Sequence, residues 1–248
     1  MAAEQDGVTD AGLSFGAVAR AYEWARPTYP ADVVDWLVPR GARRIIDLGA
    51  GTGKFTRALV DRGLDVVGVE PSAGMRETFA NVVSGATVIT GSAEDIPLED
   101  ASVDAVVVAQ AWHWVDPMRA VPEIARVLRP GGSLGLVWNT RDESEPWVAA
   151  LSDVLAQYSV TNELDSEPEV GPPFGPLESY EVRWCNPTTA EGIVELFGSR
   201  SYLITLSREE RAAALQQVRS LIMSHPDTVG REEIRLPYVT RAFRTELQ

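Results

Sequence analysis

A glycine-rich loop, Asp47–Gly53 with the sequence DLGAGTG, constrains the fold more than any other feature of the chain. It follows the short apolar run Ile45–Leu48, which predicts a buried parallel strand, and it precedes a helical pattern at Lys54–Arg62. A glycine-rich turn between a strand and a helix lets a ligand approach the backbone at the carboxyl edge of a parallel sheet. The loop therefore predicts an α/β fold with a ligand site at that edge.

Strand and helix patterns continue to alternate after this loop, which predicts parallel pairing, right-handed crossovers and a three-layer α/β sandwich. The predicted strands are Val66–Val69, Thr87–Thr90, Val103–Ala109 and Ser133–Asn139, and the helices between them are Ala73–Val83 and Met118–Leu128. The regular alternation ends there. A helix is predicted at Trp147–Tyr158, followed by an acidic, Pro- and Gly-rich loop or mobile insert at 161–177. A strand at Tyr180–Trp184, a helical region at 188–224 and a last strand at Glu232–Phe243 complete the chain.

Length and composition fit one domain. The 248 residues are 45% hydrophobic and 23% charged, which allows one α/β domain at 13–248 after a disordered tail at 1–12. The net charge of −14 repels phosphate backbones and anionic lipids, so a nucleic-acid or membrane partner is disfavoured and a cationic ligand is favoured. No apolar stretch is long enough to span a membrane and the N-terminus does not read as a secretory signal, so the expected location is the cytoplasm.

The cysteine and histidine content predicts neither a disulfide nor a metal site. Cys185 stands alone, and His113 and His225 are too far apart to suggest a ligand cluster. We therefore expect Cys185 to be a small buried residue.

Acidic residues around the glycine loop limit the classes of ligand that it can bind. The G-x-G-x-G spacing differs from the G-x-G-x-x-G of dinucleotide-binding enzymes. Asp47, two positions before the first glycine, would oppose a pyrophosphate but suits an ammonium group. Glu70 ends the second strand, where a carboxylate can accept both hydroxyls of an adenosine ribose.

Four segments, in this order, resemble the motifs of class I S-adenosylmethionine-dependent methyltransferases: Ile45–Thr56, Val67–Ser72, Gly91–Leu98 and Leu128–Leu134. Three more resemble a small-molecule subgroup, methyltransferase type 11, which includes trans-aconitate methyltransferase-like enzymes: Tyr22–Pro30, Gln110–Trp114 and, more loosely, Ser199–Tyr202. The resemblance implies a Rossmann-like, seven-stranded, mostly parallel sheet whose last strand is antiparallel. It also implies a cofactor-binding core at 43–140, covered at the carboxyl edge by an N-terminal lid at 13–38 and a helical cap at 188–224.

The resemblance also assigns residues to the cofactor and to the acceptor. The implied S-adenosylmethionine-binding residues are Tyr22, Arg26, Asp47, Gly49, Ala50, Gly51, Thr52, Glu70, Pro71, Ser72, Met75, Ser92, Ala93, Glu94 and Gln110. Many relatives have an aspartate where this chain has Ser92, so a weaker adenine contact is expected there, with Asp95 as a rival. The implied acceptor pocket contains Tyr29, Trp112, His113, Trp114, Trp138, Arg200 and Tyr202, and Gln110 and His113 are the candidate catalytic residues.

The expected function is methyl transfer to a small-molecule acceptor, through a carboxylate or hydroxyl oxygen, with S-adenosylhomocysteine as the product. His113 could act as a base towards a hydroxyl or amine, or it could only shape the pocket, since a carboxylate acceptor is already ionised. Three alternatives remain at this stage: a non-catalytic cofactor-binding protein, a methyltransferase acting on a macromolecule, and a nucleotide-dependent oxidoreductase.

Overall fold

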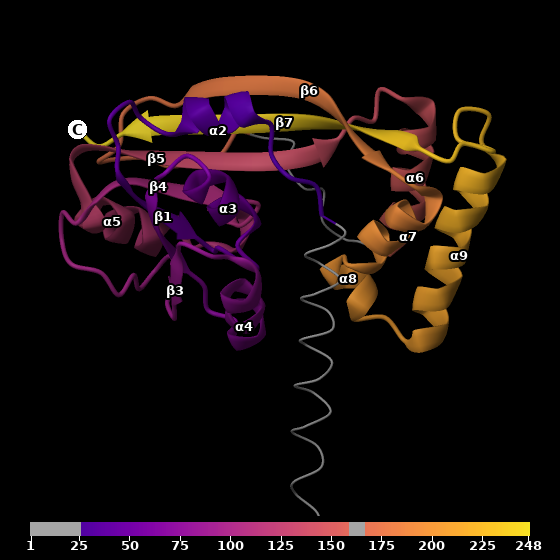
Figure 1. The fold of residues 1–248 in the computed structure, drawn as a ribbon, viewed down its shortest axis with the longest axis horizontal. Helices are drawn as coiled ribbons and strands as arrows, with labels where there is room; N and C mark the ends of the chain where they lie inside the picture. The colour runs from indigo at the N-terminus through magenta and orange to yellow at the C-terminus, as the bar shows by residue number, and fades with distance from the viewer. Residues whose placement is uncertain (1–25, 159–166) are drawn as a thin grey trace, which may run out of the picture.

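The computed structural model describes residues 26–158 and 167–248, and a seven-stranded sheet is its central element (Figure 1). The strand order is β3-β2-β1-β4-β5-β7-β6. The strands are β1 Arg44–Leu48, β2 Asp65–Val69, β3 Thr87–Ile89, β4 Val103–Ala109, β5 Leu128–Arg141, β6 Glu178–Thr188 and β7 Ile234–Glu246. Strand β7 is antiparallel to both β5 and β6, and the pairs from β3 to β5 are parallel. The predicted fold class, with its antiparallel last strand, is confirmed.

Alternating side chains along the central strands build a core on each face of the sheet. Ile46 and Val106 pack with helix α5 (Pro117–Val127) on one face. Ile45 and Val107 pack with helices α2 (Ala31–Leu37) and α3 (Lys54–Val60) on the other. Helix α4 (Ala73–Val82) lies against β3 and covers a smaller cluster. The period of two along each strand thus produces the three layers that the sequence predicts.

The predicted lid at 13–38 is wrong for its last part, which forms helix α2. Val33, Val34 and Leu37 are fully buried, and the helix packs on β6, β7 and α3 at the face of the sheet. It is therefore a core helix and does not cover the carboxyl edge, because its apolar face is needed to close that layer. Residues 13–25 of the lid, and the tail at 1–12, lie outside the described residues.

A second cluster of helices lies at the end of the long strands β5, β6 and β7, away from α2–α5 (Figure 1). It consists of α6 (Pro146–Ala156), α7 (Ala190–Gly198), α8 (Ser201–Ile204) and α9 (Arg208–Ser224) around a buried core of its own. The region predicted as helical at 188–224 thus contains three helices, while Thr188 still belongs to β6. Helix α6 joins them because Trp147 and Leu151 belong to the same core. No helix in the described ranges is long and apolar enough to cross a bilayer.

The described part of the acidic loop, 167–177, is anchored to the protein. It contains no helix or strand, but Val170 and Phe174 are buried in the core beside β5, and Phe174 forms a bridge with Leu247. The described residues thus form a loop, one of the two predicted forms, and two buried apolar side chains anchor it.

Candidate functional site

The glycine loop after β1 is fixed against its neighbours and remains open on one side. The N–H groups of Gly49 and Ala50 both donate to the Val69 carbonyl, at 2.8 and 3.1 Å. Gly49 has φ +72°, and a Cβ there would lie 2.7 Å from the Ala111 Cβ, so only glycine allows the loops after β1 and β4 to approach. Gly51 also has a positive φ, but a Cβ there would meet nothing within 4 Å. The loop therefore leaves open space above Gly51.

Glu70 is held beside this loop by backbone N–H groups. Its carboxylate accepts from Gly51 N–H at 2.9 Å and from Ser72 N–H at 2.8 Å, one bond on each oxygen. The residue is 7% exposed and directly follows β2. A carboxylate oxygen has two lone-pair sites, so each oxygen keeps the capacity to accept one more hydrogen bond. Glu70 can therefore bind a diol without losing its backbone bonds.

Asp47 lies beneath the loop and is fully buried. Its Oδ2 accepts a hydrogen bond of 2.6 Å from the Thr56 hydroxyl of α3, while Oδ1 is buried and has no hydrogen-bond partner among the described residues. Burial raises the pKa of this carboxyl to about 7, although the Thr56 hydroxyl opposes the rise. The structure therefore places a carboxyl that is only partly ionised near neutral pH where the sequence predicts an anion.

The predicted adenine-binding residues follow β2 and β3. Ser72 is the N-cap of α4 and Met75 is half-buried in its first turn. In the loop after β3, Ala93 is buried, and Glu94 links this loop to the next by accepting from Asp116 N–H at 3.0 Å. Both segments thus lie at the carboxyl ends of the two strands that follow β1 towards the edge of the sheet.

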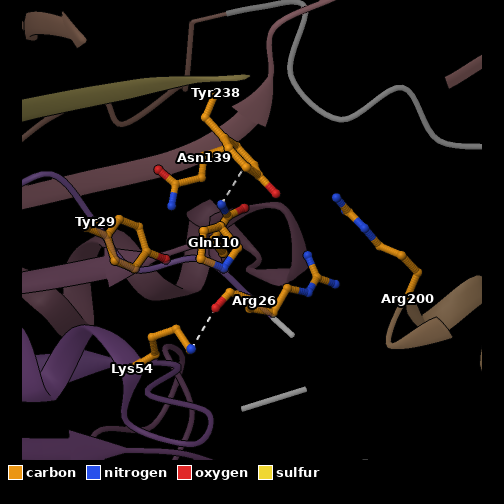
Figure 2. A pocket seen from close by; sticks show the side chains of 8 residues that line it. Arg26, Tyr29, Lys54, Gln110, Asn139, Arg200 and Tyr238 are labelled. Atoms are coloured by element: carbon orange, nitrogen blue, oxygen red, sulfur yellow. Dashed lines mark hydrogen bonds between the residues drawn. The ribbon is translucent and has the colours of Figure 1, made fainter. Parts of the chain in front are cut away.

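A pocket lies between the residue that follows the glycine loop, Lys54, and the helical cluster α6–α9, which contributes Arg200 (Figure 2). Its walls come from the N-terminal segment, the start of α3, the ends of β4 and β5, strand β7 and the α7–α8 turn. The lining residues are Arg26, Pro27, Tyr29, Lys54, Gln110, Asn139, Arg200 and Tyr238. Three of these side chains are cationic, in a protein whose net charge is −14.

Figure 2 shows Arg26 and Arg200 extending into the pocket from opposite sides, with the Tyr238 hydroxyl directed into the space between them. Tyr238 is 2% exposed, and its hydroxyl makes no hydrogen bond to the described residues. Burial raises the pKa of this phenol, against the opposing charges of Arg200, Arg141 and Arg26. The hydroxyl is therefore a neutral donor surrounded by positive charge, which is a setting that favours an anionic ligand.

Gln110 joins the pocket to the loop after β4 in a strained conformation. Its φ is +59°, a region that a non-glycine residue rarely adopts. The main-chain N–H donates to Val137, and the side-chain amide donates to the Asn139 carbonyl at 3.0 Å. Strain of this kind persists when surrounding bonds enforce it, and it is frequent at functional sites.

The structure gathers some of the predicted site residues in this pocket and separates others. Arg26, Tyr29, Gln110 and Arg200 line it. The remaining residues of the predicted acceptor pocket lie elsewhere: Trp112 and Trp138 in the core beneath the sheet, Tyr202 against the core of α6–α9, and His113 and Trp114 at the exposed surface. Tyr22 lies outside the described residues.

Trp138 is a correction with a simple physical cause. Successive residues of a strand point to opposite faces, so Trp138 enters the core while Asn139 points to the pocket. The sequence reasoning also missed Lys54 and Tyr238. Lys54 was detectable, since it follows the glycine loop directly, but nothing local distinguishes Tyr238 from the other alternating residues of β7. Within the described parts of the chain no group of His, Cys, Asp and Glu residues has the arrangement of a metal site.

Comparisons with known proteins agree with this arrangement. Residues 46–136 match the family model described as a methyltransferase domain. An uncharacterised methyltransferase of Mycobacterium tuberculosis is 48% identical over 238 residues, covering 96% of this chain and 97% of that protein. A methyltransferase-like protein of Schizosaccharomyces pombe is 35% identical over 235 residues, covering 91% and 92%. A structure from Anaeromyxobacter dehalogenans, assigned as a type II methyltransferase, is 25% identical with a TM-score of 0.63, covering 89% of this chain and 97% of that one.

The chain therefore belongs to the class I S-adenosylmethionine-dependent methyltransferases. The site fits that cofactor on three features: the open space above Gly51, the Glu70 carboxylate with its remaining acceptor capacity, and the buried Asp47 carboxyl. When bound, S-adenosylmethionine supplies a methyl group activated on a positive sulfonium.

The residues of this chain would bind the cofactor and orient it for methyl transfer. Glu70 would accept from the ribose diol, and the backbone of Gly49–Gly51 would receive the methionine end. The pocket lined by Gln110 and Arg200 lies beside the same loop, so a second molecule bound there is held close to the cofactor. Holding two reactants close together in a fixed orientation is a contribution that this geometry can make to a displacement reaction.

We predict that Glu70→Ala weakens S-adenosylhomocysteine binding at least about tenfold, because two charge-assisted hydrogen bonds of roughly 1.5–3 kcal/mol each are lost. Isothermal titration calorimetry measures the change. The control is Glu77→Ala, which removes an exposed carboxylate from α4. Equal affinities for Glu70→Ala and Glu77→Ala would remove Glu70 from the cofactor site.

Asp47 should make stability fall as pH rises. Its pKa is raised to about 7 in the folded protein, from 3.8, so the folded state holds one proton more than the unfolded state between these values. The free energy of unfolding should therefore decrease between about pH 4 and 7, with a slope approaching about 1.4 kcal/mol per pH unit from this group.

Urea unfolding of wild type and Asp47→Asn at several pH values between 5 and 8 measures that slope, and the variant should lack it. Asp153→Asn makes the same charge change at an exposed position of α6 and should follow wild type. If the wild-type and Asp47→Asn curves run parallel, the raised pKa of Asp47 is contradicted.

Proposed function

We propose that this methyltransferase acts on a small molecule and transfers the methyl group to a carboxylate oxygen. The observation that carries the proposal is the set of cationic side chains, Arg26, Lys54 and Arg200, around a neutral donor, Tyr238, in one pocket beside the cofactor loop. Positive charge concentrated in an otherwise acidic protein selects an anion by its charge, and a planar guanidinium pairs well with a carboxylate.

The walls of the pocket support a small acceptor. The N-terminal segment and the α7–α8 turn both contribute to it, so access is bounded on two sides by chain that lies outside the central sheet. A nucleic-acid acceptor is further disfavoured by the overall charge of −14, which repels a phosphate backbone. These features favour a compact organic acid over a macromolecule.

Among the described residues that line the pocket there is no histidine, aspartate or glutamate to act as a base, which agrees with a carboxylate acceptor. A carboxylic acid is ionised above about pH 5, so its oxygen attacks without losing a proton. Arg200 and the Tyr238 hydroxyl would bind the acceptor oxygen that is not methylated and fix the direction of the other one. The resemblance assigns Arg26 to the carboxylate of the cofactor, which leaves Arg200 and Lys54 as the cations for the acceptor. Gln110 would orient the acceptor at the end of β4.

The experiment is a screen of small carboxylic acids, phenols and amines for release of S-adenosylhomocysteine, with each acid paired to its primary amide. The acids should turn over, and the amides, which match them in shape but carry no charge, should be neither substrates nor good inhibitors. Selective methylation of phenols or amines would overturn the carboxylate assignment, and no turnover on any acceptor would favour a non-catalytic cofactor-binding protein.

Arg200→Gln should raise the KM for the best acid about tenfold to a hundredfold, because one charge-assisted hydrogen bond of about 1.5–3 kcal/mol is lost. It should also reduce the preference for the acid over its amide, measured by competition. Arg208→Gln removes an exposed arginine at the start of α9 and is the matched control. An unchanged preference in Arg200→Gln would mean that this arginine does not recognise the acceptor charge.

His113 distinguishes carboxylate from hydroxyl or amine chemistry. It is exposed, with its ring 5.0 Å from that of Trp114, and does not line the pocket. His113→Ala should therefore change kcat little and KM at most modestly, whereas removal of a general base typically costs about 10²–10⁴-fold in kcat. Steady-state kinetics separates the two cases. A fall in kcat beyond about a hundredfold with KM and fold unchanged would make His113 the base and overturn the carboxylate assignment.

A further inference from the structure

Asn139 connects three parts of the pocket wall through hydrogen bonds. Its side-chain amide Nδ2 donates to the Thr28 carbonyl at 2.9 Å, and its Oδ1 accepts from the Thr240 hydroxyl at 2.6 Å. Its main-chain carbonyl accepts the Gln110 amide at 3.0 Å, as a dashed line in Figure 2 marks. One residue of β5 thus binds the N-terminal segment, strand β7 and the strained residue after β4.

The direction of these bonds is fixed by a residue of the edge strand β6. The Trp184 indole, which can only donate, gives its N–H to the Thr240 hydroxyl at 2.7 Å. The hydroxyl proton of Thr240 then points to the Asn139 Oδ1. Because its oxygen is committed to Thr240, the Asn139 amide must present its NH₂ group to the Thr28 carbonyl. Thr240 is fully buried and Asn139 is 8% exposed, so water competes little for these bonds.

The segment that receives this bond is attached partly through its carbonyls. Pro27 and Pro30 lack an N–H group and cannot donate from the main chain. Lys54 Nζ donates to the Arg26 carbonyl at 2.7 Å, and Asn139 donates to that of Thr28. Tyr29 packs edge-on against Phe55, with ring centroids 4.9 Å apart. Two hydrogen bonds and one ring contact thus help to hold Arg26 and Tyr29 in the pocket.

We infer that Asn139 is a positioning residue for methyl transfer, and that the Trp184–Thr240–Asn139–Thr28 relay holds the pocket segment 26–30 in register with Gln110. Asn139 lines the pocket, but both of its side-chain hydrogen bonds are to the protein, so it supports the pocket wall. It acts through the Thr28 carbonyl and the Gln110 amide, which it places on the same side of the pocket. This inference depends on the proposed function in one respect, which is that the acceptor binds in this pocket.

Asn139→Asp and Thr240→Val test the relay. The first keeps the shape and the Thr240 bond but replaces the donor to Thr28 with an oxygen, and the second removes the hydroxyl that orients the amide. In both, hydrogen exchange at the amides of 28–34 should speed up at least about fivefold, as expected when a buried hydrogen bond is lost. The KM for the acceptor should rise by more than kcat falls. Thr240→Ser, which keeps the hydroxyl, should restore both towards wild type.

Thr245→Val is the matched control, because Thr245 is also a buried threonine of β7 and donates to the Gly175 carbonyl at 2.8 Å, outside the pocket lining. It should leave exchange at 28–34 and the acceptor KM unchanged. Exchange at 28–34 that stays at the wild-type rate in Asn139→Asp and Thr240→Val, or that rises equally in Thr245→Val, would overturn the relay. Faster exchange with unchanged kinetic constants would overturn its positioning role.

The two proposals can fail separately. Hydrogen exchange needs no acceptor, and the kinetics can use whichever acceptor the screen identifies. Turnover of a phenol or amine would therefore reject the carboxylate proposal while leaving the relay open to the same measurement. If Asn139→Asp does not fold, the milder Thr240→Val and Thr240→Ser pair still decides the outcome.

Discussion

The close approach of the loops after β1 and β4 is the constraint on which the rest of this structure depends. The chain runs from β1 outward to β3, then crosses to β4 and continues in the opposite direction, so these two loops diverge at a switch point in the sheet. Because Gly49 has no side chain, the two loops can approach closely. A Cβ on Gly49 would lie only 2.7 Å from the Ala111 Cβ. Glu70 follows the strand next to the first of these loops, and the pocket is lined by Lys54, where the first loop ends, and by Gln110, where the second begins.

Charge is distributed in a way that the composition conceals. The chain carries 36 acidic and 22 basic residues, yet three basic residues from distant parts of the sequence converge on one pocket. Arg26, Lys54 and Arg200 are brought together by a segment before α2, the first turn of α3 and the turn after α7. Salt and water screen the charges at the acidic surface, so their attraction for a ligand is weak. Burial strengthens the attraction between the basic pocket and an anion, because the local dielectric is lower.

The helical cluster α6–α9 is integrated with the site through the strands that carry it. Strand β5 ends at Arg141, whose guanidinium lies over the Phe197 ring of α7 at 5.0 Å, and Tyr238 of β7 packs into the core of the same cluster. The position of Arg200 is therefore tied to the sheet by packing. A change of acceptor specificity in such a protein can arise in these helices without disturbing the glycine loop, since the two regions bury different cores.

The sequence by itself determined the order of strands and helices, the class of cofactor and most of the residues beside the glycine loop. Those features are local, because a period of two, a helical pattern and the spacing of Gly49, Gly51 and Glu70 can each be recognised within a short window. Only the tertiary structure decided which face each residue occupies. The alternation of one strand sends Trp138, which was expected in the pocket, into the core and brings Asn139 to the pocket in its place. Tyr238 enters the pocket from a strand more than a hundred residues away from Gln110. Long-range packing sets such positions, and no local pattern carries them.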